Sequence, residues 1–195
     1  GVSGISSPLS RALFRTIIAS CDLFLVRDKA AMQQCIGTKA RLTSDLAFTL
    51  ADQLHFPDRD RKNGAQRTVA ITVCPQAFDV GSRSAAVETF RKTVQILLSQ
   101  GHRVIFIGML RSDLLENDLT FIQSIVEHFE AEHGVEIRTP GPKSEEISRA
   151  FHDIDVVVGM RFHALVIAAI FGIPFVGIAH DNKIREISRH FDMQY

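Results

Sequence analysis

Short apolar runs alternate with amphipathic stretches over the last two thirds of the chain. Five runs, each four to seven residues long, lie at residues 68–74, 103–107, 135–138, 155–158 and 174–178. Runs of this length and composition are typical of parallel strands that are buried on both faces. Strands that alternate with helices for more than a hundred residues predict a Rossmann-like α/β domain, which we place at residues 68–195.

The amphipathic stretches between these runs predict helices. The clearest has Ser84 as a candidate N-cap, places Phe90 and Val94 on its apolar face, and ends at Gly101, where glycine suits a left-handed C-terminal position. A second helix is expected to stop at Gly134, and a third to begin after Ser144.

The first quarter of the chain has its own pattern. Amphipathic residues 8–19 lead into a short apolar run within residues 22–28, and a further helical candidate covers residues 29–35. Residues 1–51 are therefore interpreted as the C-terminal part of a first α/β domain. Residues 52–67 are dense in alternating charge and are predicted to be a linker.

The net charge, the apolar runs and the cysteine content argue against several classes of protein. Among 195 residues, 22 Lys and Arg balance 22 Asp and Glu, so no bulk attraction to nucleic acid or anionic membranes is expected. The longest uncharged run, residues 164–179, is interrupted by Gly172 and Pro174, which argues against a membrane span. Three cysteines without metal-ligand spacing predict buried, reduced thiols in a cytoplasmic protein.

Several cofactor and nucleophile motifs are absent from the sequence. It contains no G-x-G-x-x-G, P-loop or G-x-S-x-G pattern and no paired Cys/His ligand set. Nicotinamide, P-loop and zinc chemistry are therefore disfavoured, and neither a cofactor nor a metal is predicted.

In an open parallel sheet, ligands bind beyond the carboxyl ends of the strands. The segments that follow the five runs are residues 75–78, 108–111, 139–142, 159–163 and 180–183. The fourth is the richest, because backbone amides, the Arg161 guanidinium and the His163 imidazole could meet one phosphate or carboxylate. The fifth places Lys183 at the start of the last predicted helix, as a second cation.

The shared role of Arg161 and His163 sets a geometric condition. Residues two apart share a face in extended chain but not in a helix, so regular helix should begin no earlier than about Phe162. The residue chemistry alone favours the alternative that Arg161 forms an ion pair across the sheet end and His163 satisfies backbone carbonyls. Asp113, Glu116 and Asp118 are interpreted as a solvated loop and helix start.

The segment GMRFHALVIAAIFGIPFVGIAHDNKI, residues 159–184, resembles the signature of the polysaccharide pyruvyl transferase family. Residues 26–37, 44–48 and 144–159 resemble further segments of that family, so the resemblance covers most of the chain. Family members resemble two-domain GT-B glycosyltransferases and are typically nearly twice as long. The resemblance implies the end of a first domain followed by most of a second.

The resemblance also implies a reaction. A pyruvyl group passes from phosphoenolpyruvate, the donor substrate, to two hydroxyls of a sugar in a polysaccharide precursor, giving a cyclic ketal and phosphate. Arg161 and His163 match positions that the family is thought to use for the donor. The expected substrate-binding residues beside them are Gly159, Met160, His180, Asp181 and Lys183.

The expected partners are phosphoenolpyruvate and a sugar or glycan-precursor acceptor. Peripheral contact with a lipid-linked acceptor is compatible with this prediction. Two alternatives stay open, namely a GT-B nucleotide-sugar glycosyltransferase and a non-catalytic fragment or binding module. The first would bind a nucleoside diphosphate, and the second would bind donor without turnover.

Overall fold

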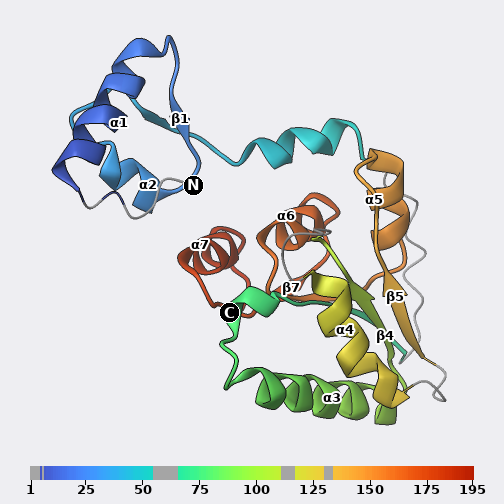
Figure 1. Ribbon diagram of the computed structural model, residues 1–195. Coiled ribbons are helices and arrows are strands. Elements are labelled where there is room, and N and C mark those ends of the chain that lie inside the picture. The colour runs from blue at the N-terminus through green and yellow to red at the C-terminus, as the bar shows by residue number, and fades with distance from the viewer. Residues whose placement is uncertain (1–4, 6, 55–65, 111–116, 130–133) are drawn as a thin grey trace. The chain divides into compact units, whose positions relative to one another are not determined.

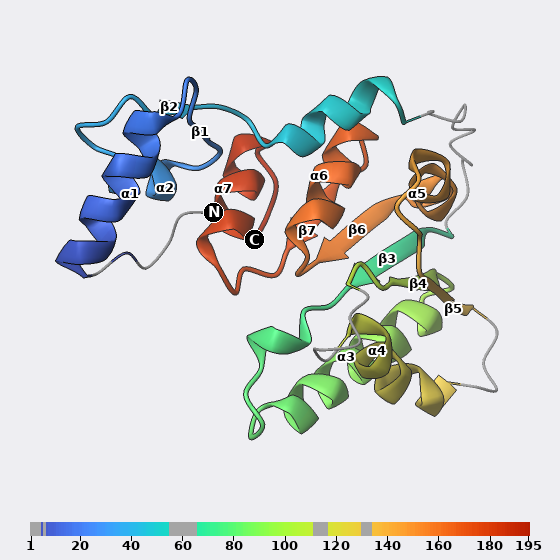
Figure 2. The same cartoon turned by 45° about the horizontal axis from the view of Figure 1, so that its top comes forward.

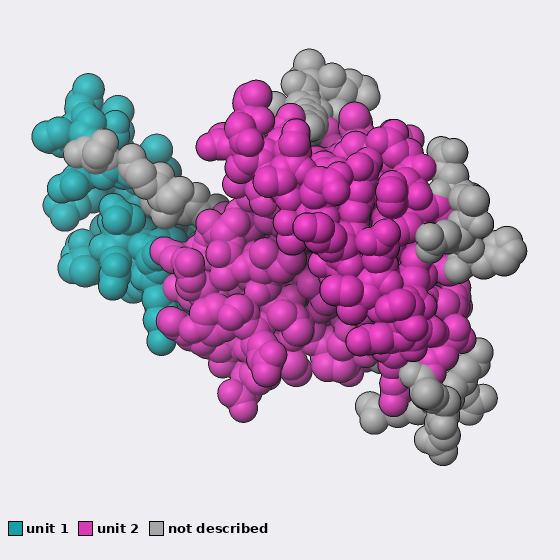
Figure 3. Space-filling view, turned by 90° about the horizontal axis from the view of Figure 1, so that it is seen from below, with its two compact units in different colours: residues 1–49 teal, residues 50–195 magenta. Residues whose placement is uncertain are grey.

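The chain divides into two compact units, residues 1–49 and residues 50–195 (Figure 3). A computed structural model describes residues 5, 7–54, 66–110, 117–129 and 134–195. Most of the predicted linker, residues 55–65, lies outside the described residues. Each unit is described by itself below.

The first unit is a small α/β arrangement around a two-stranded parallel sheet. Its elements are α1 (Pro8–Ser20), β1 (Leu25–Val26), α2 (Lys29–Gln34) and β2 (Arg41–Leu42), followed by the 3-10 helix η1 (Leu46–Asp52). The helices predicted over residues 8–19 and 29–35 are confirmed. α2 begins at Asp28, whose side chain accepts a hydrogen bond from the amide of Ala31 at 2.6 Å. Ile18, Val26 and Cys35 belong to the core of this unit.

The second unit is built on a five-stranded parallel sheet with the order β5-β4-β3-β6-β7. Its strands are β3 (Thr68–Thr72), β4 (Arg103–Ile107), β5 (Val135–Arg138), β6 (Val156–Gly159) and β7 (Phe175–Gly177). All five predicted strands are present, and no strand boundary differs from its prediction by more than two residues. Every residue of the central strand β3 is buried, as expected for a parallel strand covered on both faces.

Helices cover both faces of the sheet. They are α3 (Arg83–Ser99), α4 (Asp118–Val126), α5 (Ser144–Phe151), α6 (Phe162–Ile170) and α7 (Asn182–His190), with short 3-10 helices η2 (Pro75–Ala77) and η3 (Glu127–Phe129). Figures 1 and 2 show α3 and α4 on one face and α5, α6 and α7 on the other. The chain passes outward from β3 to β5 and then returns to β6, so right-handed crossovers place the two groups of helices on opposite faces.

The predicted start of α3 needs correction. α3 begins at Arg83, so Ser84 is not its N-cap; Ser82 precedes the helix, and its amide donates to Asp79 Oδ1 at 2.7 Å. The Asp79 side chain thus forms a local turn that starts the helix earlier than the apolar pattern indicates. The second helix becomes 3-10 over Glu127–Phe129, and residues 130–133, which precede its predicted stop at Gly134, lie outside the described residues. Gly101 has the predicted left-handed backbone, with φ of 80°.

Aromatic rings pack on each face of the sheet. On the α3 and α4 face, the Phe121 ring stacks on Phe78 at 5.7 Å between centroids and meets Phe90 edge-on at 6.3 Å. On the opposite face, Phe151 of α5 stacks with Phe171 at the end of α6 at 6.2 Å. These contacts hold the crossover helices against the sheet.

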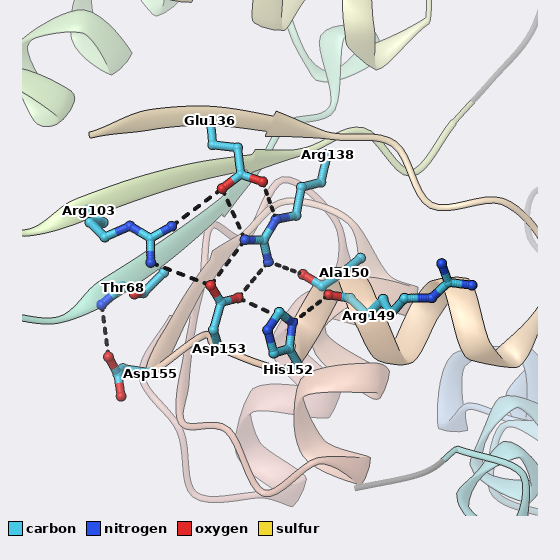
Figure 4. A network of polar contacts seen from close by, with 9 residues as sticks. All are labelled: Thr68, Arg103, Glu136, Arg138, Arg149, Ala150, His152, Asp153 and Asp155. Carbon is cyan, nitrogen blue, oxygen red and sulfur yellow. Dashed lines mark hydrogen bonds and ion pairs between the residues drawn. The ribbon is translucent and has the colours of Figure 1, made fainter. Parts of the chain in front are cut away.

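A network of charged side chains connects α5 and the turn after it to strands β4 and β5 (Figure 4). Arg138 of β5 forms a two-point ion pair with Asp153, with nitrogen to oxygen distances of 2.6 and 3.1 Å. The same guanidinium donates to the carbonyl of Ala150 at 3.0 Å and to Glu136. Arg103 of β4 lies 3.5 Å from Asp153. The turn after α5 is therefore tied to both β4 and β5.

Candidate active site

The carboxyl ends of β3 and β6 form the point where the strand order reverses. β3 lies between β4 and β6, so its outgoing loop runs toward one side while the loop after β6 runs toward the other. Such a position is where open α/β sheets bind ligands. Arg161 lies there, between β6 and α6. Its backbone is extended, with φ of −93° and ψ of 118°, and α6 begins at Phe162, which meets the geometric condition set by the sequence.

Gly159 lets α6 approach the end of β6 closely. A Cβ atom at this position would lie 2.4 Å from Leu165 Cδ2 and 3.2 Å from Thr72 Oγ1. The carbonyl of Gly159 also accepts a hydrogen bond from the amide of Ile178 at 2.8 Å, which joins this loop to the end of β7. Glycine at the end of β6 therefore sets the distance between the strand and the helix that follows it.

The Arg161 guanidinium is held along one edge. Its Nε donates to the carbonyl of Val73 and to Asp118 Oδ2, each at 3.1 Å. Its Nη2 donates to Gln76 Oε1 at 2.9 Å and also forms an ion pair with Asp118 Oδ1. The arginine side chain keeps 20% of its surface exposed. An ion pair of Arg161 across the sheet end, which the residue chemistry favoured, is thus present.

Asp118 was not singled out from the sequence, and its interpretation as a solvated residue is wrong. Its side chain is fully buried, and Oδ2 accepts from the amides of Met109 and Leu110 at 3.0 Å each. Asn117 caps α4 by accepting from the amide of Thr120, so Asp118 is the first helical residue and turns inward. The available signal was an acidic residue at a helix start beyond the carboxyl end of a strand. Arg111, Asp113 and Glu116 lie outside the described residues.

The three cysteines are free thiols, of which Cys35 and Cys74 are buried and Cys21 is half-buried. Cys74 lies beside the arginine site. Burial raises the pKa of its thiol, against the opposing effect of the Arg161 charge. Burial likewise raises the pKa of Cys35. Both buried side chains therefore stay neutral thiols at physiological pH, and neither is an activated nucleophile.

The other residues expected at the loop after β6 differ in their surroundings. His163 is exposed in the first turn of α6, and its ring meets that of Phe162 edge-on at 5.4 Å between centroids. Met160 turns its side chain into the hydrophobic core, and its amide donates to the carbonyl of Thr72 at 3.0 Å. Met160 thus supports the sheet end with both its side chain and its amide.

The loop after β7 carries the remaining expected residues, next to the end of β6. Asp181 is the N-cap of α7 and accepts from the amide of Ile184 at 3.0 Å. His180 is exposed, with Nε2 3.9 Å from Asp181 Oδ2, and Lys183 is half-buried as the second residue of α7. Asp181 therefore has a structural role as a cap, whereas His180 and Lys183 border the end of β7.

The first unit has a hollow of about 520 Å³ at the carboxyl ends of β1 and β2. Arg27 and Asp45 line it and form an ion pair. Asp45 also accepts from the amide of Ala47 at 2.9 Å, at the start of η1.

Two other kinds of feature are absent from the parts of the chain that the structure describes. No group of three or more His, Cys, Asp or Glu side chains there could hold a metal ion. None of the helices found there has the length and apolar character needed to cross a membrane.

The fold and this site together define a Rossmann-like α/β protein with a fixed cation at its switch point. The family model described as polysaccharide pyruvyl transferase matches residues 1–182, and the chain belongs to that family. A search of curated proteins gave no match.

The fold is similar to that of a solved structure from Listeria monocytogenes that is described as a UDP-N-acetylglucosamine 2-epimerase. The TM-score is 0.63 at 10% sequence identity, over 98% of this chain and 50% of that one. The chain thus spans half the length of the structure it matches. The predicted fold class, a Rossmann-like parallel-sheet domain of GT-B type, is confirmed.

Proposed function

We propose that this protein transfers a pyruvyl group from phosphoenolpyruvate to sugar hydroxyls of a polysaccharide precursor, with Arg161 and His163 acting on the donor. Family membership supports pyruvyl transfer to polysaccharides. The observation that carries the proposal is the position of Arg161, whose guanidinium is fixed at the switch point directly before the first turn of α6.

The chemistry of the donor suits this position. Phosphoenolpyruvate carries a phosphate and a carboxylate, so its binding requires cations and N–H donors at two points. The Nε and Nη2 atoms of Arg161 are occupied by protein acceptors, while no residue that the structure describes accepts a hydrogen bond from Nη1. We assign Nη1 to one anionic group of the donor. The positive end of the α6 dipole adds to the attraction.

His163 is assigned to the departing phosphate. In the proposed reaction, a proton adds to the methylene carbon of phosphoenolpyruvate and creates an oxocarbenium-like centre at the neighbouring carbon. One sugar hydroxyl attacks this centre and loses its proton, and the carbon–oxygen bond to phosphate then breaks, which regenerates an oxocarbenium-like centre. The second hydroxyl attacks that centre and loses its proton, which closes the ketal. The two protons released balance the one added to the methylene carbon and the one taken up by the departing phosphate. His163 would bind the phosphate or donate a proton as it leaves.

Residues at the end of β7 would complete the donor site. Lys183 lies in the first turn of α7, after the strand that pairs with β6. A cation at that place would attract the second anionic group of the donor. We include His180 as a further polar contact, while Asp181 would act through its cap on α7. Gly159 and Met160 would contribute by setting the backbone path into α6.

A nucleotide-sugar glycosyltransferase is the second candidate function. It is favoured by the fold similarity to a structure that is named for a UDP-sugar substrate. This candidate predicts that UDP, rather than phosphoenolpyruvate, raises the melting temperature.

A thermal-shift series tests the proposal. At a concentration of about 100 times Kd, phosphoenolpyruvate should stabilise the wild type by about 2.7 kcal/mol, seen as a rise of several degrees in Tm. Arg161→Ala should abolish the rise, and His163→Ala should reduce it. Arg149→Ala is the matched control, because Arg149 is an exposed arginine of α5 outside the proposed site.

Turnover is checked by phosphate release and by the mass gain of a sugar acceptor. A shift with UDP and none with phosphoenolpyruvate would contradict pyruvyl transfer and support the glycosyltransferase. Donor binding without phosphate release, across a panel of sugar acceptors, would support a binding module.

A further inference from the structure

We infer that Asp118 is a positioning residue, which fixes the plane of the Arg161 guanidinium so that its Nη1 edge is presented to the donor. This inference rests on the proposed function, and it adds to that function a residue of α4 that the sequence pattern did not single out. It also links the loop after β4 to a site otherwise formed by the ends of β3, β6 and β7.

The hydrogen bonds of Arg161 define which edge of the guanidinium is held. Asp118 accepts from Nε through one oxygen and from Nη2 through the other, the two-point geometry in which a carboxylate and a guanidinium lie in one plane. The carbonyl of Val73 and the side chain of Gln76 accept from the same two nitrogens. Rotation of the guanidinium would break all four interactions, so only Nη1 is left to face a ligand.

Asp118 is itself fixed in place. Its Oδ2 accepts from two consecutive amides, those of Met109 and Leu110, in addition to Arg161. Because the carboxylate is fully buried, loss of the arginine would leave an uncompensated charge out of reach of water. The ion pair therefore connects the loop after β4 to the start of α6 in a fixed geometry. It differs from an exposed ion pair, in which water can replace either partner.

Asp118 could affect donor binding by orienting Arg161 or by its negative charge, and these two roles predict opposite effects of the same substitution. A buried negative charge beside Arg161 weakens the attraction of the arginine for an anion. If Asp118 acted through charge alone, Asp118→Asn would tighten the binding of phosphoenolpyruvate. If Asp118 orients the guanidinium, the same change would weaken binding, because the amide NH2 of asparagine faces Nη2 with a donor where an acceptor is needed.

Isothermal titration with phosphoenolpyruvate distinguishes these cases. We expect Asp118→Asn to raise Kd about tenfold or more, which corresponds to the loss of about 1.4 kcal/mol of binding free energy. Asp155→Asn is the matched control, since Asp155 accepts from the amide of Thr68 at the opposite end of the same strands. Its Kd should equal that of the wild type.

A second background separates orientation from a general loosening of the site. Lysine is a flexible point charge that a two-point contact does not orient. Asp118→Asn should therefore have little effect on Kd in a protein that already carries the Arg161→Lys substitution. An equal loss of affinity with arginine and with lysine at this position would show a merely structural role and overturn the inference.

Failure of the inference and failure of the proposed function give different results. If the wild type binds phosphoenolpyruvate, Arg161→Ala does not, and Asp118→Asn binds as tightly as the wild type or more tightly, the positioning role is overturned while the proposed function stands. If the wild type does not bind phosphoenolpyruvate, the proposed function is overturned.

The positioning itself is tested on the wild type, independently of ligand and of whether Asp118→Asn folds. The measurement is the NMR signals of the arginine side chains. Hindered rotation and slow hydrogen exchange of the Arg161 Nε and Nη2 protons support the inference. Averaged Nη signals, as for an exposed arginine, would overturn it.

Discussion

Gly159 shows how one missing side chain controls the position of a whole site. Its Cα lies so close to α6 that an added methyl group would overlap Leu165 Cδ2. Arg161 follows Gly159 by two residues and His163 follows it by four, so any displacement of α6 moves both side chains. The conformational freedom of glycine is not the issue here, since close packing alone requires it.

Gly159→Ala should therefore lower stability by about 1–3 kcal/mol, as expected for overpacking in a core. Chemical denaturation with urea measures the change. Leu165→Val removes the overlapping Cδ atoms, so the double variant should lose less stability than the sum of the two single variants. Gly81→Ala is the control, because its nearest contact would be at 3.8 Å and the residue is exposed. Additive losses would show that the overlap with Leu165 is not the cause.

The sequence predicted the two residues of the proposed site that follow β6, but not the side chains that hold Arg161 in place. Arg161 was accessible to prediction because it directly follows an apolar run. For Asp118 the sequence offered only an acidic residue at a helix start, since its contact with Arg161 depends on which strands are neighbours: β4 lies beside β3, and β3 beside β6. Strand order is a long-range property that no local pattern of apolar residues contains. Gln76 lies in the candidate segment 75–78 that follows β3, but its hydrogen bond with Arg161 depends on the same strand order.

At the scale of elements, local patterns were more informative. Each strand of the second unit lies where a short run predicted it. Burial on both faces demands continuous hydrophobic residues in β3 and β4, whereas β5 at the edge of the order carries Glu136 and Arg138 and has no fully buried residue. Helix starts were less predictable. Ser84 had the right chemistry for a cap, but the Asp79 side chain organised the turn before it. Several polar side chains near a helix start can accept hydrogen bonds from its free amides, and the apolar pattern does not show which of them does so.

The charged network that joins β5 to the turn after α5 predicts a pH dependence of stability. Burial tends to raise the pKa of Asp153, but hydrogen bonds and the positive charge of Arg138 outweigh it and lower the pKa. Because its pKa is lowered in the folded state, Asp153 stabilises the fold at any pH above the pKa of the unfolded state, which is about 4. That contribution is lost as the pH falls through the folded pKa.

Asp153→Asn should cost about 1.5–3 kcal/mol at pH 7, the range for hydrogen bonds to charged groups. The difference from the wild type should shrink as the pH is lowered below about 4. Melting curves from pH 7 to pH 3 provide the measurement, with Asp192→Asn as an exposed-turn control. A difference that stays constant over this range would mean that the charge of Asp153 makes no contribution.

At the scale of the whole molecule, the two units have separate hydrophobic cores. Ile18, Val26 and Cys35 belong to one, while Ile71, Val104 and other residues around β3 and β4 belong to the other. Because the two cores share no residues, one unit can unfold locally while the core contacts of the other unit remain.

Ile18→Ala should thus destabilise the first unit by about 2–5 kcal/mol. Hydrogen exchange measured by mass spectrometry should become faster in α1 and α2 and stay unchanged in β3 and β4. Ile105→Ala, at a fully buried position of β4, serves as the converse variant and should affect the sheet instead. Faster exchange in β3 and β4 after the change at Ile18 would indicate a single cooperative unit.

The central place of β3 has a consequence for synthesis on the ribosome. β3 is the first strand of its sheet to be made, and it pairs with β4 on one side and β6 on the other. The β6 side stays unpaired until residues 156–159 have emerged, long after β4 is available. During that interval a largely apolar strand offers an open edge to other nascent chains. We therefore expect translation that stalls between β5 and β6 to yield aggregates, whereas a stall after β7 would release a sheet in which both edges of β3 are paired.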